Sequence, residues 1–71
     1  MDWQKLENVE VGTNRFADGE WRVIEDEMAI TLEVKSNGLG EKMTVPSILP
    51  PDAYPIIAEL LIKGMNSVEP K

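Results

Sequence analysis

The chain has 71 residues and a mass of 8.0 kDa, which predicts one domain with one small core. It contains no cysteine and no histidine, so disulfides, thiol nucleophiles, Cys/His zinc sites and Ser-His or Cys-His relays are excluded. Seven basic residues against thirteen acidic ones give a net charge of -6, which argues against duplex nucleic acid as a partner. We expect a protein that is not an enzyme and that uses no cofactor, metal or small-molecule substrate.

Hydrophobic residues make up 42% and charged residues 28% of the chain, as is usual for a folded globular protein. No apolar run approaches the roughly 20 residues that span a bilayer, and no secretory signal follows Met1. We therefore expect a cytoplasmic protein without a membrane segment. The compact domain is expected over 1–65, with 66–71 as a frayed tail.

The first third of the chain predicts a β-hairpin. Residues 1–8 fit a helix or a strand, whereas Val9 to Gly12 favours a strand. Asp18-Gly19 separates two β-prone segments, Thr13 to Ala17 and Glu20 to Ile24. A two-residue Asp-Gly loop is typical of a type I′ hairpin turn, so we expect the chain to reverse there.

A second hairpin is predicted by alternating hydrophobicity. Four apolar residues recur at every second position: Met28, Ile30, Leu32 and Val34. Such a period of two places one face on the core and the other toward water. Turn residues 36–40 then lead to a strand over Lys42 to Val45, with Met43 and Val45 facing inward, and Pro46 ends that strand because it cannot donate to a ladder.

One helix is predicted after the prolines at positions 50, 51 and 55. Either Asp52 caps it, with Pro55 in the first turn, or Tyr54 caps it. Gly64 is expected in the left-handed position after the last turn, with Met65 packing back on Leu60. The order of elements predicts an α+β fold, a small antiparallel meander of three to four strands packed by one C-terminal helix.

The predicted helix is apolar over about 240° of its circumference. That arc is wider than one sheet can cover, so we expect part of it to form a homodimer interface. The interface residues proposed on this basis are Ile56, Ile57, Leu60, Leu61 and Ile62. The alternative is that the N-terminal segment, with Trp3 and Leu6, wraps over the second side of the helix.

The predicted first hairpin brings two pairs of side chains into register. With a turn at Asp18-Gly19, Phe16 would face Trp21, and Arg15 would face Arg22 on the other side. The arginines would then need an anion between them, supplied by a ligand or by the chain's own carboxylates. These four residues are an alternative site for an anion or for nucleic acid, and the aromatic pair could equally belong to the core.

Glu25-Asp26-Glu27 is the densest charge cluster of the chain. Successive strand residues point to opposite faces, and no calcium-loop pattern surrounds the cluster, so we expect no metal there. It is either a solvated turn or an acidic docking patch for a basic protein surface.

A resemblance is carried by residues at the predicted strand-to-helix junction: Leu49, Pro51, Asp52, Tyr54, Ile57, Glu59 and Leu61. They resemble this junction in the single-stranded-DNA-binding coactivator family called positive cofactor four. The resemblance spans about thirteen residues and implies strands followed by a C-terminal helix, dimerisation and binding of single-stranded DNA. The binding strands of that family look basic. This chain is acidic overall, and its strand region offers only four cations: Arg15, Arg22, Lys35 and Lys42.

These inferences predict a small acidic interaction module, a homodimer that docks on a basic protein partner as an inhibitor, adaptor or regulator and that can mimic nucleic-acid charge. The alternatives are a sheet that binds single-stranded nucleic acid, like positive cofactor four, and a structural subunit of a larger assembly.

Overall fold

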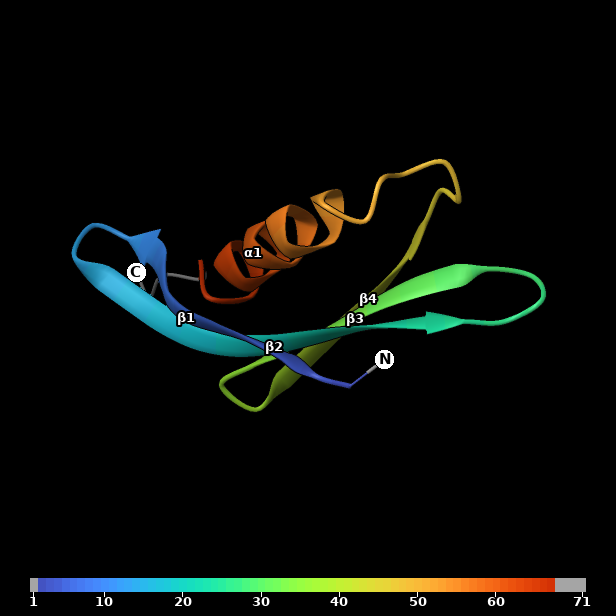
Figure 1. Cartoon of the computed structure of the whole chain (residues 1–71). Coiled ribbons are helices and arrows are strands. Elements are labelled where there is room, and N and C mark those ends of the chain that lie inside the picture. Colours follow the sequence, from blue (N-terminus) through green and yellow to red (C-terminus); the bar gives the residue numbers. More distant parts are fainter. Residues whose placement is uncertain (1, 68–71) are drawn as a thin grey trace.

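The computed structural model describes residues 2–67 and shows a four-stranded antiparallel sheet with one helix on one of its faces (Figure 1). The strands are β1 (Gln4–Gly12), β2 (Arg15–Glu25), β3 (Ile30–Ser36) and β4 (Leu39–Val45), followed by α1 (Ala53–Met65). Their order in the sheet is β1-β2-β3-β4, a simple meander. The predicted α+β architecture is confirmed, and residues 4–8 belong to a strand.

The alternating segment forms β3, which lies in the middle of the sheet between β2 and β4. Leu32 and Val34 are completely buried. Met28 was predicted on the same face but lies in the loop before β3, almost fully exposed. Asn37 and Gly38 link β3 to β4, and both have positive φ (51° and 78°), as a type I′ turn requires. Strand β4 ends at Val45, directly before the proline, as predicted.

The predicted turn at Asp18-Gly19 is wrong, because β2 continues through both residues without reversing. The chain reverses instead between Gly12 and Arg15, which are paired. Asn14 takes the positive φ (54°) that this tight connection needs. The error changes the pairing of the whole segment, because β2 then lies in register with β1 on one side and with β3 on the other.

Gly19 sits inside a strand because the helix approaches the sheet at that point. A Cβ atom on Gly19 would lie 2.5 Å from Cδ1 of Ile62 and 2.8 Å from the carbonyl oxygen of Lys35. Both separations are shorter than any normal carbon contact. Gly19 therefore marks close approach of the fully buried Ile62 side chain to the sheet, a common role of glycine within strands.

A β-bulge in β1 lies beside this contact. The register shifts between Leu6 and Val9, and Asn8 has a positive φ of 56°. Its backbone N-H donates a 2.9 Å hydrogen bond to Oδ1 of Asp18. Asp18 thus stabilises the irregular strand opposite it, which accounts for an aspartate at a position where the sequence predicted a turn.

The helix starts as one of the two predicted alternatives and ends differently from the prediction. Asp52 is the N-cap residue, although its side chain makes no capping hydrogen bond, and Pro55 is third in the helix. Gly64 remains helical, and the helix ends at Met65 with Asn66 as its C-cap, whose backbone N-H donates to the carbonyl oxygen of Ile62. Met65 is half-buried against the core. The predicted left-handed stop at Gly64 is therefore wrong.

Asn66 also ties the helix end to the sheet. Its side chain bonds Asn37 and Ser36, and its carbonyl oxygen accepts a hydrogen bond from Arg15. Asn66 is thus held by the fold, while residues 68–71 of the predicted frayed tail lie outside the described residues.

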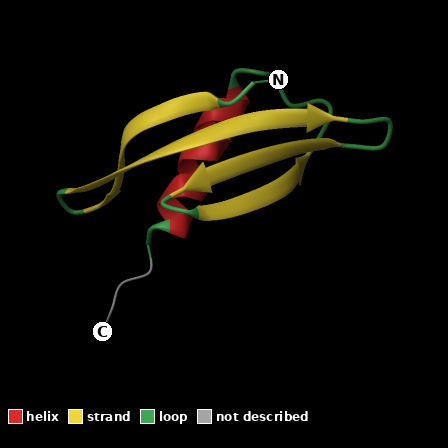
Figure 2. Cartoon of the chain, turned by 90° about the horizontal axis from the view of Figure 1, so that it is seen from below, coloured by secondary structure: helices red, strands yellow, loops and turns green. Residues whose placement is uncertain are grey.

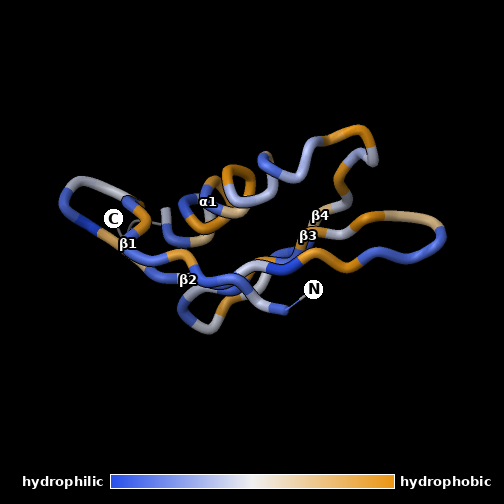
Figure 3. The backbone as a smooth tube through the Cα atoms, in the orientation of Figure 1, coloured by the Kyte–Doolittle hydropathy of each residue, from blue (hydrophilic) through white to orange (hydrophobic). Residues whose placement is uncertain are grey.

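The core lies between α1 and one face of the sheet, where orange apolar segments of the helix and strands meet (Figure 3). Its buried side chains are Val9, Ala17, Trp21, Val23, Leu32, Val34, Val45, Ala58 and Ile62. The Trp21 and Tyr54 rings pack with centroids 6.5 Å apart, a favourable tilted aromatic contact. This arrangement leaves the second face of the sheet free of the helix.

Candidate functional site

The face of the sheet opposite α1 is not covered by the helix (Figures 1 and 2). Paired residues of an antiparallel sheet point to the same side, and neighbours along a strand point to opposite sides. Because Leu32 and Val34 face the helix, Glu33 and Lys35 face the open side. Their cross-strand partners share that open face.

Two rows of charged side chains cross this open face. The first row runs Lys5, Glu20, Lys35 and Gly40, and the second runs Arg22, Glu33 and Lys42. Trp3 joins the second row, since its ring contacts Arg22. We define the open-face patch by the side chains that this register assembles: Trp3, Lys5, Glu20, Arg22, Glu33, Lys35 and Lys42.

The Trp3 ring contacts two cations of the patch, Arg22 and Lys35. Cζ of Arg22 is 4.6 Å and Nζ of Lys35 is 4.2 Å from the ring centroid. These are cation-π contacts, which hold an indole ring and a cation together. Trp3 is half-buried. The alternative in which the N-terminal segment covers the helix is therefore wrong for Trp3, whose ring lies on the opposite side of the sheet, whereas Leu6 does pack against the core.

Glu33 links the two cations of the second row. Nε of Arg22 donates a 2.6 Å hydrogen bond to Oε1 of Glu33, and Nζ of Lys42 lies 3.9 Å from Oε2. The Arg22 hydrogen bond lowers the pKa of Glu33 below its ordinary value, and the charges of Arg22, Lys42 and Lys35 act in the same direction against desolvation. Glu33 therefore stays ionised and orients Arg22 rather than acting as a proton donor.

The lowered pKa of Glu33 predicts a loss of stability in acid. A carboxyl whose pKa is lower in the folded state stabilises the fold above its unfolded pKa, and this contribution disappears as the pH falls through the folded pKa. The Glu33→Gln variant should therefore be less stable than wild type near neutral pH, with the difference shrinking in acid. Urea titrations across the pH range measure this difference. In an Arg22→Gln background, the stability difference caused by Glu33→Gln should be smaller at neutral pH. An undiminished difference would contradict Arg22 as the main cause of the lowered Glu33 pKa.

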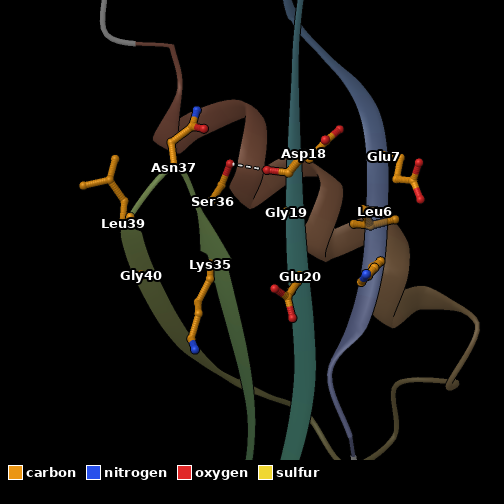
Figure 4. Close-up of a pocket in the computed structure, with 12 residues that line it drawn as sticks. Leu6, Glu7, Asp18, Gly19, Glu20, Lys35, Ser36, Asn37, Leu39 and Gly40 are labelled. Atoms are coloured by element: carbon orange, nitrogen blue, oxygen red, sulfur yellow. Dashed lines mark hydrogen bonds between the residues drawn. The ribbon is translucent and has the colours of Figure 1, made fainter.

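A hollow of about 610 Å³ adjoins the first row (Figure 4). Lys5, Glu20, Lys35 and Gly40 line it together with residues of the β3–β4 turn. Gly40 pairs with Lys35 and has no side chain, so no side chain of β4 covers Lys35 at this end of the row. In the close-up the Lys35 and Glu20 side chains lie side by side on neighbouring strands, with α1 behind the sheet. The patch thus borders a recess lined by two exposed lysines, Lys5 and Lys35.

Charge is unevenly distributed between the patch and the rest of the chain. The patch holds four of the seven basic residues and two carboxylates, a local charge of +2. The other described residues hold two basic residues and ten carboxylates, a charge of -8. A protein that is acidic as a whole therefore carries a basic surface around an aromatic ring.

The four residues of the alternative anion site do not come together. Trp21 is in the core, and Arg15 lies on the helix side, where it bonds Asn66. Phe16 is exposed on the open side beyond the patch, opposite Glu10. Arg22 alone belongs to the patch. The predicted grouping is wrong because it depended on the turn at Asp18-Gly19.

The predicted helix interface is partly available. Ile62 is completely buried beneath the helix, so its inclusion is wrong. Ile57 and Leu61 are half-buried against the core. Ile56 and Leu60 are 62% and 61% exposed. The surplus apolar surface is therefore a narrow row on the outer side of α1.

The predicted acidic patch lies where β2 ends, with Glu25 as the last residue of the strand and Asp26 and Glu27 in the loop that leads to β3. Oδ1 of Asp26 accepts hydrogen bonds of 2.8 Å from the backbone N-H groups of Met28 and Ala29. Glu25 and Glu27 are exposed, and among residues 2–67 no group of three or more acidic side chains is placed to hold a metal ion. Asp26 thus shapes the turn, and two carboxylates remain fully available to a partner.

Sequence reasoning missed Trp3 and Lys5 as site residues and named Lys35 and Lys42 only as strand cations. The usable signal was the spacing of charges at alternate positions, with Glu20 and Arg22 in one strand and Glu33 and Lys35 in the next. Alternate charges can be assigned to a common face only when the strand register is known. The wrongly predicted turn at Asp18-Gly19 gave the wrong register.

Comparison of the chain with protein-family models, with curated proteins and with solved structures found no match. Within residues 2–67, α1 is too short to cross a bilayer. The fold and the open-face patch are therefore the basis for assigning a function.

Proposed function

We propose that this protein is a non-enzymatic binding module that holds single-stranded nucleic acid on the open-face patch. The observation that carries the proposal is the placement of Trp3 over Arg22 and Lys35 on the uncovered side of the sheet. Binders of single strands combine a basic track for the backbone with an aromatic ring on which a base stacks.

The cations of the patch suit a phosphate backbone that crosses the strands. Lys5 and Lys35 are two strands apart in one row, and Arg22 and Lys42 are two strands apart in the next. Neighbouring strands are about 4.8 Å apart, so the positive charges within each row are separated by roughly 10 Å. In the second row Glu33 lies between the two cations, bonding Arg22 and lying 3.9 Å from Nζ of Lys42. An extended backbone can thus meet several cations in turn.

Trp3 favours a single strand over a duplex. A base can stack on the indole ring only when it is unstacked from its own neighbours, as bases in single strands readily are. The surrounding acidic surface repels additional phosphates, which limits binding to the patch itself. A short single strand is therefore the ligand that this geometry favours.

The proposal predicts that two lysines of equal charge differ in their effect on binding. Lys35→Ala should weaken binding to a short oligothymidylate and reduce the salt dependence by about 0.7 in the log-log slope, the value for one lost contact to a single strand. Lys63→Ala, which removes the same charge from the helix, should leave both quantities unchanged. Fluorescence anisotropy of a labelled oligonucleotide at several salt concentrations measures them.

Trp3→Ala should weaken the same binding by about tenfold, since stacking on an aromatic side chain contributes about 1–3 kcal/mol per base. Circular dichroism and urea unfolding control for the fold, because Trp3 lies outside the buried core. Equal affinities of wild type, Trp3→Ala and Lys35→Ala would contradict the assignment of the patch.

A second function is favoured by the excess of carboxylates outside the patch. Those ten carboxylates are all exposed, and Glu25 and Glu27 stand on a turn that Asp26 keeps in shape. We propose, as the competing hypothesis, that this surface docks on a basic protein and acts as an inhibitor, adaptor or regulator, because complementary charge speeds association and selects basic grooves.

The competing hypothesis predicts binding to a basic protein that weakens steeply with added salt. The Glu25→Gln/Glu27→Gln variant should bind less well, whereas Lys35→Ala should bind at least as well as wild type. Isothermal titration against a basic nucleic-acid-binding protein tests this, and salt-insensitive binding would rule it out.

A further inference from the structure

We propose that the outer side of α1 pairs with the same surface of a second copy, antiparallel, about a two-fold axis at Leu60. The surface consists of Ile56, Leu60 and Gly64, which we call the helix ridge. These residues recur every four positions and therefore form one row along the helix. Ile56 and Leu60 project away from the fully buried Ala58 and Ile62. The pairing does not depend on nucleic-acid binding.

The helix ridge is complementary to itself in shape. When two helices are antiparallel about an axis at Leu60, each Ile56 lies at the level of Gly64 of the second copy. A Cβ atom placed on Gly64 would have no neighbour within 4 Å among the described residues, apart from its chain neighbours and the nearby backbone of its own helix. The large side chain of one copy therefore meets open space on the other. A two-fold interface requires such a surface, because the same patch serves both partners.

The flank of the ridge is neutral in an otherwise acidic protein. Nζ of Lys63 lies 3.6 Å from Oε1 of Glu59 on the same helix. The two-fold arrangement places both flanks on the same side of the interface. Measured along the helix axis, Glu59 of one copy then lies within roughly 3 Å of Lys63 of the second copy. Two molecules of charge -6 can thus approach at this surface with opposite charges adjacent. This favours a second copy over an unrelated acidic or basic partner.

The pairing would leave both open-face patches accessible. Because α1 covers one face of the sheet and the patch occupies the other, joining two helices directs the two patches away from each other. A dimer of this kind presents two separate binding surfaces. It predicts that variants of the ridge change association without changing the affinity of one patch for a short oligonucleotide.

Sedimentation velocity over a wide concentration series tests the pairing. We expect a reversible monomer-dimer equilibrium that Gly64→Leu weakens by about tenfold or more, since leucine would fill the space required by Ile56 of the second copy. Leu60→Ala should weaken dimerisation in the same direction. Leu39→Ala, which alters an exposed leucine on β4, is the matched control and should have no effect.

Unfolding measurements separate loss of association from loss of fold. Gly64→Leu should fold at least as well as wild type in the monomer, because leucine favours a helix over glycine and its Cβ meets open space. A protein that remains monomeric at every concentration would overturn the pairing. So would a dimer that is indifferent to both ridge substitutions, or an assembly larger than a dimer, which a closed two-fold contact does not produce.

Discussion

Gly19→Ala is expected to destabilise the protein by roughly 2 kcal/mol or more. Replacing glycine by alanine within a strand usually stabilises by about 0.5–1 kcal/mol through chain entropy. Here the added methyl group would lie 2.8 Å from the carbonyl oxygen of Lys35 and 2.5 Å from Cδ1 of Ile62. The first neighbour is backbone and cannot rotate away, so the steric cost outweighs the entropic gain. Urea unfolding monitored by circular dichroism measures the net effect.

The cause of that loss can be isolated with Ile62→Val. This change removes Cδ1, the nearest side-chain atom, at its own cost of about 0.5–1.5 kcal/mol. Gly19→Ala should cost less in the Ile62→Val background than in wild type, since contacting residues are coupled. Equal costs in the two backgrounds would show that the helix does not restrict position 19. A stabilising Gly19→Ala would contradict the close packing of α1 on β2.

Leu32→Ala is expected to destabilise the protein by about 2–5 kcal/mol. Leu32 is completely buried in β3 and pairs with Val23 on one side and Met43 on the other. Truncation removes apolar contacts and leaves a cavity that flanking strands cannot readily fill. A domain of this size is stable by only about 4–10 kcal/mol, so the variant should be largely unfolded at modest urea concentrations.

Leu39→Ala provides the matched comparison for this core substitution. It removes the same atoms from a leucine that is 52% exposed on the edge strand β4. Its effect should remain within about 0.5 kcal/mol, as for most surface substitutions. If the two substitutions had similar costs, the placement of the core between α1 and the sheet would be wrong.

Several elements could be predicted because local signals agreed with the fold. The alternation around Leu32 identified β3, and Asn37-Gly38 lies in the predicted turn region before β4. Pro46 ends β4, and the proline cluster preceded the helix. In each case the local preference and the tertiary environment require the same residue type.

Asp18-Gly19 could not be interpreted correctly from local sequence, because both residues serve tertiary contacts. Gly19 admits Ile62, which is 43 positions further along the chain, and Asp18 bonds the bulged Asn8. A turn signal and a close-packing site use the same two residue types. The prediction that Gly64 ends the helix failed as well, because Gly64 remains helical on an open surface.

The site was harder to predict than the fold, since its members are recognisable only after the register is known. Lys5, Glu20 and Lys35 are 15 positions apart along the sequence, yet they form one row across three strands. Trp3 precedes the first strand and gave no periodic signal of its own. The wrongly predicted turn at Asp18-Gly19 paired these side chains with other residues, so the patch could not be predicted.

The central claim is that the open side of the sheet is the binding surface, and amide chemical-shift mapping tests it directly. When a short oligothymidylate is added to the labelled protein at low salt, we predict that the largest shifts occur at Trp3 and at the neighbouring cations Lys5, Arg22, Lys35 and Lys42. The helix ridge and the Glu25–Glu27 loop should remain unchanged. Shifts confined to that loop or to α1, or no shifts at all, would contradict this account.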